Sequence, residues 1–464
     1  MQEFGLDFTK TKDEAQKQLL NSLEGWLKES YERHSNTDWK GSHDEGTYLT
    51  SWREYYLLTE DEMVLNYANE MLQKAEKWIS DHFYHGYHKH QEVHHGTEHF
   101  IIFLAWILEL QPEHELAKKQ LKEASVHIVN TYDDSPKWYD YKSNRFTSTH
   151  LGTKKYNIIS RILGKLTQDI NIVEHLRLIR MAWLGLETGG PEDLWDIIID
   201  YSNEWVNQIL NSEQVPVYLD AKEKSNWLFK WALNTFIGAA PKEMNKTTRS
   251  EIHIANGTPD LFLSLYEQTK NEKYLQTAKK ILKPLADQLK SPYAHPVADI
   301  LWNLRSEGVE LDFVKKELSL VKDNIDKQIS ELNHLNLDFD PSIHWNNTKY
   351  HNTIGIRKDM PALVLTSKAG EKIILPSPAT LGLLSKLTKD EIYLHIALEL
   401  ANAVLQEAKE RYPDGRMHGC SSKGIHSFCV GHGRNWGAGY VSTALRFSIE
   451  EKYHGIKLPK LDID

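Results

Sequence analysis

The chain has 464 residues, of which 40% are hydrophobic and 26% charged, and its formal net charge at pH 7 is −10. This length allows one large domain or two to three ordinary ones, with a sizeable core. The acidic balance and the lack of a Lys/Arg run exclude a nucleic-acid partner, and no stretch approaches the roughly 18 apolar residues of a membrane span.

Long amphipathic helices are predicted along most of the chain. In 13–33, apolar residues recur at helical spacing on one side, at Leu19, Leu23 and Leu27 among others. The same spacing predicts further helices over 61–82, 113–132, 170–187, 271–290 and 390–411.

A quasi-repeat relates these helices. Three stretches, from Leu57, Tyr266 and Leu384, each end one helix, make a short polar turn (TED, TKNE, LTKD) and start an amphipathic helix. Their starts recur about every 50 residues or at about twice that interval, a period typical of helical-pair arrays. Helices before the turns, such as 100–110, are apolar on nearly every side, whereas the helices after the turns are amphipathic, with apolar residues on one face.

This alternation predicts two concentric layers of helices. We therefore expect an all-α fold, an (α/α)6 toroid that forms a single catalytic domain over residues 1–464. An open solenoid is the alternative, but it needs polar capping repeats that the sequence does not contain. One segment differs: 361–376, PALVLTSKAGEKIILP, predicts a β-hairpin whose turn contains Gly370.

Histidines gather where helices are predicted to begin. In HHGTEH, Thr97 is a predicted N-cap, and His95 and His99 share one side if the helix begins early. They suit a catalytic base or a metal ligand, and equally a hydrogen-bonded core histidine. In SHDEG, His43 can pair with Asp44 or Glu45 as a polarised acid–base group, or the acids can cap a helix.

The glycine-rich segment GCSSKGIHSFCVGHGRNWGAGY near the C-terminus offers two kinds of site. Cys420, His426, Cys429 and His432 have a spacing that zinc can impose, although it matches no standard zinc-finger pattern. The same loop can also be purely structural, held by backbone hydrogen bonds.

Arg434 and Asn435, followed by Trp436, are better candidates in that segment for binding a carboxylate, because arginine offers a bidentate fork and asparagine an amide donor. A helix is predicted to resume at Gly437.

Two further clusters each place a histidine and a polar partner before a helix. They are His150 with Tyr156, and His253 with Asn256. In a toroid, such helix ends converge on one cleft.

The repeated hairpins, the Trp-rich inner helices and these His/Asn/Tyr/Arg clusters resemble the (α/α)6-toroid carbohydrate-active enzymes. Within that group the chain is most similar to uronate-acting polysaccharide lyases and to the oligosaccharide dehydratases of ulvan degradation. The resemblance implies a carbon–oxygen lyase that eliminates water or an alkoxide from a uronic acid residue of an oligo- or polysaccharide. Such an enzyme is expected in the periplasm or outside the cell, and a cytoplasmic location stays open.

On this interpretation the proton-transfer groups are His95 or His99 as base and Tyr156 or His43 as acid. Arg434 and Asn435 neutralise the uronate carboxylate. The remaining expected substrate-binding residues are Trp436, His150, His253, Asn256 and His432.

Three alternatives stay open at this point. An unsaturated uronyl hydrolase of this fold is expected to use a pair of aspartates, and a sugar epimerase two opposed histidines. A non-catalytic helical array that binds a glycan is the third. A divalent metal, zinc or calcium, is expected only if histidines of two clusters meet, and the sequence leaves the oligomeric state open.

Overall fold

The structure is a computed structural model that describes residues 10–35, 46, 49–84, 87–88, 93–128, 139–146, 171–219, 245–293, 295–334, 339–345, 361–411, 437–449, 458 and 461. The chain forms two compact units. The first comprises Met1–Asp38, Thr47–Met71 and Leu285–Gly455. The second comprises Trp39–Gly46, Leu72–Pro284 and Ile456–Asp464.

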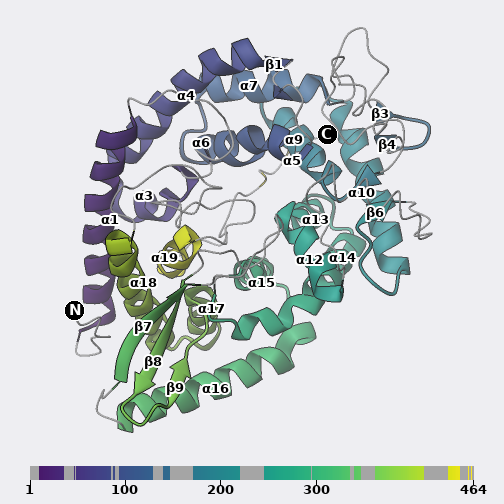
Figure 1. Cartoon of the computed structure of the whole chain (residues 1–464). Helices are drawn as coiled ribbons and strands as arrows, with labels where there is room; N and C mark the ends of the chain where they lie inside the picture. Colours follow the sequence, from purple (N-terminus) through teal and green to yellow (C-terminus); the bar gives the residue numbers. More distant parts are fainter. Residues whose placement is uncertain are drawn as a thin grey trace, which may run out of the picture. The chain divides into compact units, whose positions relative to one another are not determined.

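The first unit is built mainly of helices. Helix α18 packs against α1, α17 and α19 (Figure 1). Leu19, Leu23 and Leu27 form the buried stripe of α1, as their helical spacing predicts, and the Asn402 amide of α18 donates to the Ala15 carbonyl at 2.9 Å. The described helices of this unit are α1 (Lys12–His34), α3 (Arg53–Thr59), the first half of α4 (Glu62–His82), η2 (Lys283–Lys290) from Leu285 onward, α15 (Val297–Ser306), η3 (Asp312–Val314), α16 (Lys315–His334), α17 (Pro378–Thr388), α18 (Glu391–Arg411) and α19 (Gly437–Arg446).

A three-stranded antiparallel sheet, in the order β7–β8–β9, also belongs to the first unit. Strands β8 (Pro361–Ser367) and β9 (Lys372–Ile374) form the predicted hairpin, and Gly370 in its turn has a φ of 84°. Strand β7 (Phe339–Trp345) pairs with β8 along its whole length and was not predicted. It contains a proline and several polar residues, so the sequence there lacks a strand's apolar alternation.

The second unit surrounds helix α9 (His175–Glu187), in which every residue from His175 to Gly185 is buried. Helix α9 packs against α5, α7, α10 and the π-helix η1. The other described helices of this unit are the second half of α4, α5 (Val93–Glu98), η1 (His99–Leu104), α6 (Ala105–Leu110), α7 (Glu115–Val126), α10 (Leu194–Asn211), α12 (Lys246–Ala255), α13 (Thr258–Thr269) and α14 (Glu272–Leu282). Its strands form two-residue pairs, which are β1 (Phe83–Tyr84) with β2 (Tyr87–His88), β3 (Tyr139–Asp140) with β4 (Arg145–Phe146), and β5 (Asn171–Ile172) with β6 (Tyr218–Leu219).

The predicted polar turns have a defined geometry, as the turn between α13 and α14 illustrates. Lys270 caps α13 in the left-handed conformation, with φ 57°, and its N–H donates to the Tyr266 carbonyl at 2.7 Å. Thr269 accepts from the Asn271 N–H at 3.2 Å, and the Asn271 side chain accepts from the Lys273 N–H at 3.1 Å. One Thr-x-Asn tripeptide thus ends one helix and caps the next.

Two turns of the first unit repeat this arrangement, between α3 and α4 and between α17 and α18. Both use the pattern Thr-x-Asp, and the central residue is again left-handed without being glycine. The matching residues are Thr59, Glu60 and Asp61 in the first turn and Thr388, Lys389 and Asp390 in the second.

The described residues are therefore mostly helical, as the sequence predicts, whereas the toroidal arrangement of the hairpins stays a prediction. Within the part of the chain that the structure describes, no helix combines the length and the apolar character that crossing a membrane requires.

Candidate functional site

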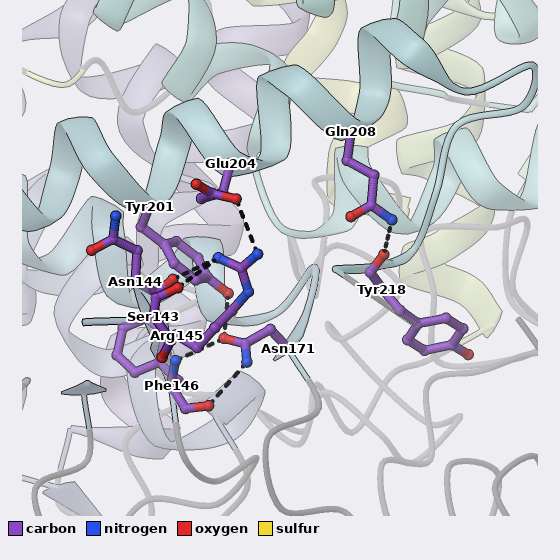
Figure 2. Close-up of polar contacts among 9 residues, drawn as sticks. All are labelled: Ser143, Asn144, Arg145, Phe146, Asn171, Tyr201, Glu204, Gln208 and Tyr218. Carbon is purple, nitrogen blue, oxygen red and sulfur yellow. Dashed lines mark hydrogen bonds and ion pairs between the residues drawn. The ribbon is translucent and has the colours of Figure 1, made fainter. Parts of the chain in front are cut away.

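Two residues, Val173 and Glu174, connect β5 to α9, and a hydrogen-bond network fixes this connection. The Asn171 side chain accepts from the Phe146 N–H at 2.8 Å and donates to the Phe146 carbonyl at 2.9 Å (Figure 2). The Tyr201 hydroxyl of α10 donates to the same amide oxygen at 3.0 Å. Strand β5 is therefore tied to the β3–β4 hairpin and to α10 immediately before α9 begins.

Further contacts hold the hairpin and β6 on the same helix. Arg145 of β4 forms an ion pair with Glu204 of α10 at 3.0 Å, and the Gln208 amide donates to the Tyr218 carbonyl at 2.8 Å (Figure 2). Helix α10 thus anchors both short strand pairs that flank the start of α9.

His175 closes the turn into α9. Its Nδ1 accepts from the Ile172 N–H at 3.0 Å, and its ring stacks on Phe146 with 5.0 Å between the ring centroids and 15° between the planes. Because the residues on both sides are fixed in this way, Glu174 is held at the N-cap position of α9.

Arg177 is the centre of a buried polar cluster. Its side chain is 2% exposed, and its Nε donates to Thr97 Oγ1 at 2.9 Å. Nη1 donates to the Ala255 carbonyl at 3.4 Å, and Nη2 lies 3.8 Å from Glu98 Oε1. Burial lowers the pKa of Arg177, and the nearby Glu98 and Glu174 oppose this effect. The guanidinium therefore connects α5, α9 and α12.

Glu174 lies on the same helix end as Arg177. The residue is 3% exposed, and burial raises the pKa of its carboxyl to about 8, although the Arg177 charge acts in the opposite direction. Its Oε2 has no hydrogen-bond partner among the described residues. With this pKa the carboxyl is mostly protonated at neutral pH and can donate a proton.

His99 follows Thr97 and Glu98 directly and begins the π-helix η1, a kind of helix that is frequent at functional sites. Its Nε2 lies 2.8 Å from Gln120 Oε1. An amide oxygen only accepts, so Nε2 carries the proton and Nδ1 the lone pair. Burial lowers the pKa of His99 to about 4, and its imidazole is neutral at pH 7.

The predicted start of this helix needs correction. Helix α5 begins at Val93, so Gly96 and Thr97 lie inside it and Thr97 is not an N-cap. The Thr97 hydroxyl instead donates to the Val93 carbonyl at 2.7 Å, one turn back, while accepting from Arg177. Such a bond from a threonine hydroxyl to the carbonyl four residues back slightly destabilises a helix and often bends it. The backbone of His95 also lies in α5, and its side chain is outside the described residues.

His253 and Asn256 end helix α12 and precede α13. His253 Nε2 donates to the Pro216 carbonyl at 2.7 Å, and burial lowers the pKa of the ring to about 4. The Asn256 amide donates to the Ile252 carbonyl at 2.8 Å, and it adjoins Ala255, which contacts Arg177. The structure therefore brings Asn256 near the Arg177 cluster, whereas His253 donates its hydrogen bond to a backbone carbonyl.

The other predicted site residues lie outside the described residues, and with them the cysteines of the zinc hypothesis. Among the residues that the structure describes, no group of three or more His, Cys, Asp or Glu side chains could hold a metal ion. The site residues in question are His43, His150, Tyr156, His432, Arg434, Asn435 and Trp436.

The sequence interpretation missed Glu174, Arg177 and Glu98. The signal was present in VEHLRLIRMAW, where charged residues interrupt an otherwise apolar helix. Charged residues on a helix that is buried on all sides need partners, and they mark a polar cluster.

The first unit contains a second buried charged cluster. Arg446 Nε lies 2.9 Å from Glu54 Oε1, and its Nη1 lies 2.8 Å from Asp299 Oδ2. Arg53 Nη1 lies 3.6 Å from the same Glu54 oxygen. Two cations thus face two anions, and the nearby acids keep the pKa of Arg446 above its usual value despite burial.

The described chain is thus a mostly helical protein whose second unit holds Arg177 near two buried carboxyl groups, and His99, a neutral histidine, follows one of these acids, Glu98, in the sequence. Comparisons with protein-family models, with curated proteins and with solved structures find no match.

Proposed function

We propose that this protein is a carbon–oxygen lyase that eliminates water or an alkoxide from a uronic acid residue of an oligo- or polysaccharide. The observation that carries the proposal is the run Thr97–Glu98–His99, of which two residues contact Arg177 and the third presents a neutral imidazole. The resemblance to toroid carbohydrate-active enzymes supports the same class.

The chemistry of such an elimination explains why these groups are needed. The C5 proton of a uronate is weakly acidic until the adjacent carboxylate is neutralised, and a preorganised cation supplies that stabilisation. A neutral histidine can then accept the C5 proton, here at Nδ1 of His99.

Arg177 suits the carboxylate-binding role because its only described ion-pair distance, 3.8 Å to Glu98, is longer than a hydrogen bond. Its planar fork can bind a carboxylate through two N–H groups. Arg434 and Asn435 remain the other candidates for this role, and His43 and Tyr156 for proton transfer.

The test is product analysis with uronate-containing oligosaccharides. We expect new ultraviolet absorbance from a C4–C5 double bond. For dehydration the product mass falls by one water, for hydrolysis a bond is cleaved with gain of water, and for epimerisation the mass is unchanged. Hydrolysis products or an unchanged mass across a broad glycan panel would overturn the lyase proposal.

A matched pair of variants tests the base. His99→Gln is expected to lower kcat by about 100-fold or more, because general-base catalysis contributes about that much. His295→Gln changes an equally buried histidine of the first unit, whose Nδ1 accepts from the Val297 N–H at 3.2 Å, and it is expected to keep kcat within a few-fold. Equal losses in the two variants would remove His99 from the mechanism.

A further inference from the structure

We propose that Glu174 is the proton donor to the departing C4 oxygen in this elimination, a role that rests on the proposed function above. The starting observation is geometric. Glu174 is almost completely buried at the N-cap of α9, and its Oε2 has no hydrogen-bond partner among the described residues.

Charge balance explains why this carboxyl can hold a proton. Arg177 carries one positive charge and is shared by two buried carboxyl groups, Glu98 and Glu174. Only Glu98 lies within ion-pair distance, at 3.8 Å. When two acids share one cation in a buried site, one of them stays protonated at a pH where an exposed acid is ionised.

The charges near Glu174 oppose the effect of burial on its pKa. The N-terminus of α9 favours the ionised carboxyl, as does Arg177 on the same helix. The ionisable side chains on this helix and on the elements packed against it include His175 and Arg180 of α9, Glu98 of α5 and His99 of η1. Burial outweighs the favourable charges and raises the pKa of Glu174 to about 8.

The complete step balances protons and electrons. The base removes the C5 proton, and the electron pair of that C–H bond becomes the second C4–C5 bond while the C4–O bond breaks. Glu174 transfers its proton to the leaving oxygen, which departs as water or an alcohol. The newly formed carboxylate lies beside Arg177, whose charge stabilises it, and the proton on the base returns to Glu174 through solvent.

This role identifies the class of leaving group. Hydroxide and sugar alkoxides are strong bases and leave only when protonated, whereas a nitrophenolate leaves without a proton. The site is therefore suited to uronates whose C4 oxygen carries hydrogen or a sugar, and a donor such as Glu174 is unnecessary for an activated C4 aryl ether.

The experiment compares Glu174→Gln with the wild-type chain on two substrates, a uronate oligosaccharide and a uronate bearing a 4-nitrophenyl ether at C4. We expect kcat to fall by about 100-fold or more on the oligosaccharide and by no more than a few-fold on the aryl ether. Glu187→Gln, at the exposed end of the same helix, is the matched control and should leave both rates unchanged.

The pH profile supplies a readout that a purely structural role would not change. In the wild-type chain, kcat on the oligosaccharide should fall as the pH rises through about 8, and this basic limb should disappear in Glu174→Gln. If Glu174→Gln does not fold, as judged by circular dichroism, Glu174→Asp serves instead. Because aspartate keeps a carboxylic acid, the ratio of kcat on the aryl ether to kcat on the oligosaccharide should rise only weakly in this variant.

The outcomes separate the two proposals. The role of Glu174 alone is overturned if the wild-type chain eliminates from uronates and Glu174→Gln is slowed equally on both substrates, or on neither of them. A wild-type chain inactive on every uronate glycan and on the aryl ether overturns the proposed function, and the role of Glu174 with it.

Discussion

Replacing Arg446 by methionine should destabilise the first unit strongly. Arg446 forms two short ion pairs, 2.9 Å to Glu54 and 2.8 Å to Asp299, and the three side chains are at most 4% exposed. Methionine fills a similar volume but leaves two buried carboxylates with one cation, Arg53, which lies 3.6 Å from Glu54. Removing one partner of a buried ion pair costs about 3–5 kcal/mol, and we expect a loss in that range at pH 7.

Two control variants separate charge from packing. Arg305→Met removes an exposed pair with Glu310, where the side chains are 41% and 76% exposed, and should cost less than about 1 kcal/mol. In the double variant Arg446→Met/Asp299→Asn, Glu54 keeps Arg53 at 3.6 Å and the cluster is again neutral. We expect this double variant to recover more than half of the loss.

Hydrogen exchange at buried amides of α15 and α18 measures the unfolding free energy of this unit directly. The destabilisation of Arg446→Met should shrink as the pH falls toward 4, because the two carboxyl groups then take up protons. A loss no larger than that of Arg305→Met, or one independent of pH, would refute the reasoning.

Three further changes act in the second unit. The buried ring of His253 has a pKa of about 4, against 6.5 in the unfolded chain, so its contribution to the stability of the unit is complete above pH 6.5 and is lost as the pH falls toward 4. His253→Gln should therefore reduce the loss of unfolding free energy between pH 6.5 and pH 4 by about 3 kcal/mol at most, as measured by hydrogen exchange. Asn271→Ala should cost about 0.5–2 kcal/mol in urea unfolding, because the Lys273 N–H loses its cap. Gly257→Ala should lower the unfolding free energy by about 2 kcal/mol or more, since φ is +66° and a Cβ there collides with the Arg180 guanidinium. Adding Arg180→Ala to this variant should restore part of the lost free energy.

Each of these expectations has a result that contradicts it. An unchanged acid slope in His253→Gln means that the ring is not the group that titrates on unfolding. An unchanged unfolding free energy in Asn271→Ala means that water replaces the cap. An unchanged unfolding free energy in Gly257→Ala means that the chain between α12 and α13 relaxes at no cost.

Local structure was predictable from the sequence where one residue pattern determines one geometry. The polar turns TED, TKNE and LTKD were identified as ends of helices, and the structure shows that Thr-x-Asp or Thr-x-Asn makes the turn and the cap in each. The hairpin around Gly370 was predictable for the same reason, because two apolar runs flank a turn residue. Strand β7 was not, since its partner lies beyond it in the sequence and its own residues lack alternation.

The candidate site was predictable only in part. His99 was found because histidines crowd a helix start, and its Gln120 partner, 21 residues away, could not be read from the local pattern. Glu174 and Arg177 were missed because their segment was predicted to be an amphipathic helix, on which charged residues are expected to face solvent. Their significance depends on burial and on the approach of α5 and α12, which are properties of the folded chain.

The π-helix η1 makes the position of His99 depend on the length of the chain as well as on residue identity. From Phe100 to Ala105 the backbone spans five residues per hydrogen bond, where an α-helix spans four. The segment therefore contains, in effect, one inserted residue. Deleting any one residue between His99 and Leu104 would let the helix continue as regular α-helix, and each residue contributes about 100° of rotation. His99 would then turn away from Gln120 although no side chain at either position had changed, so a gain or loss of one codon can switch this site while the helix itself persists.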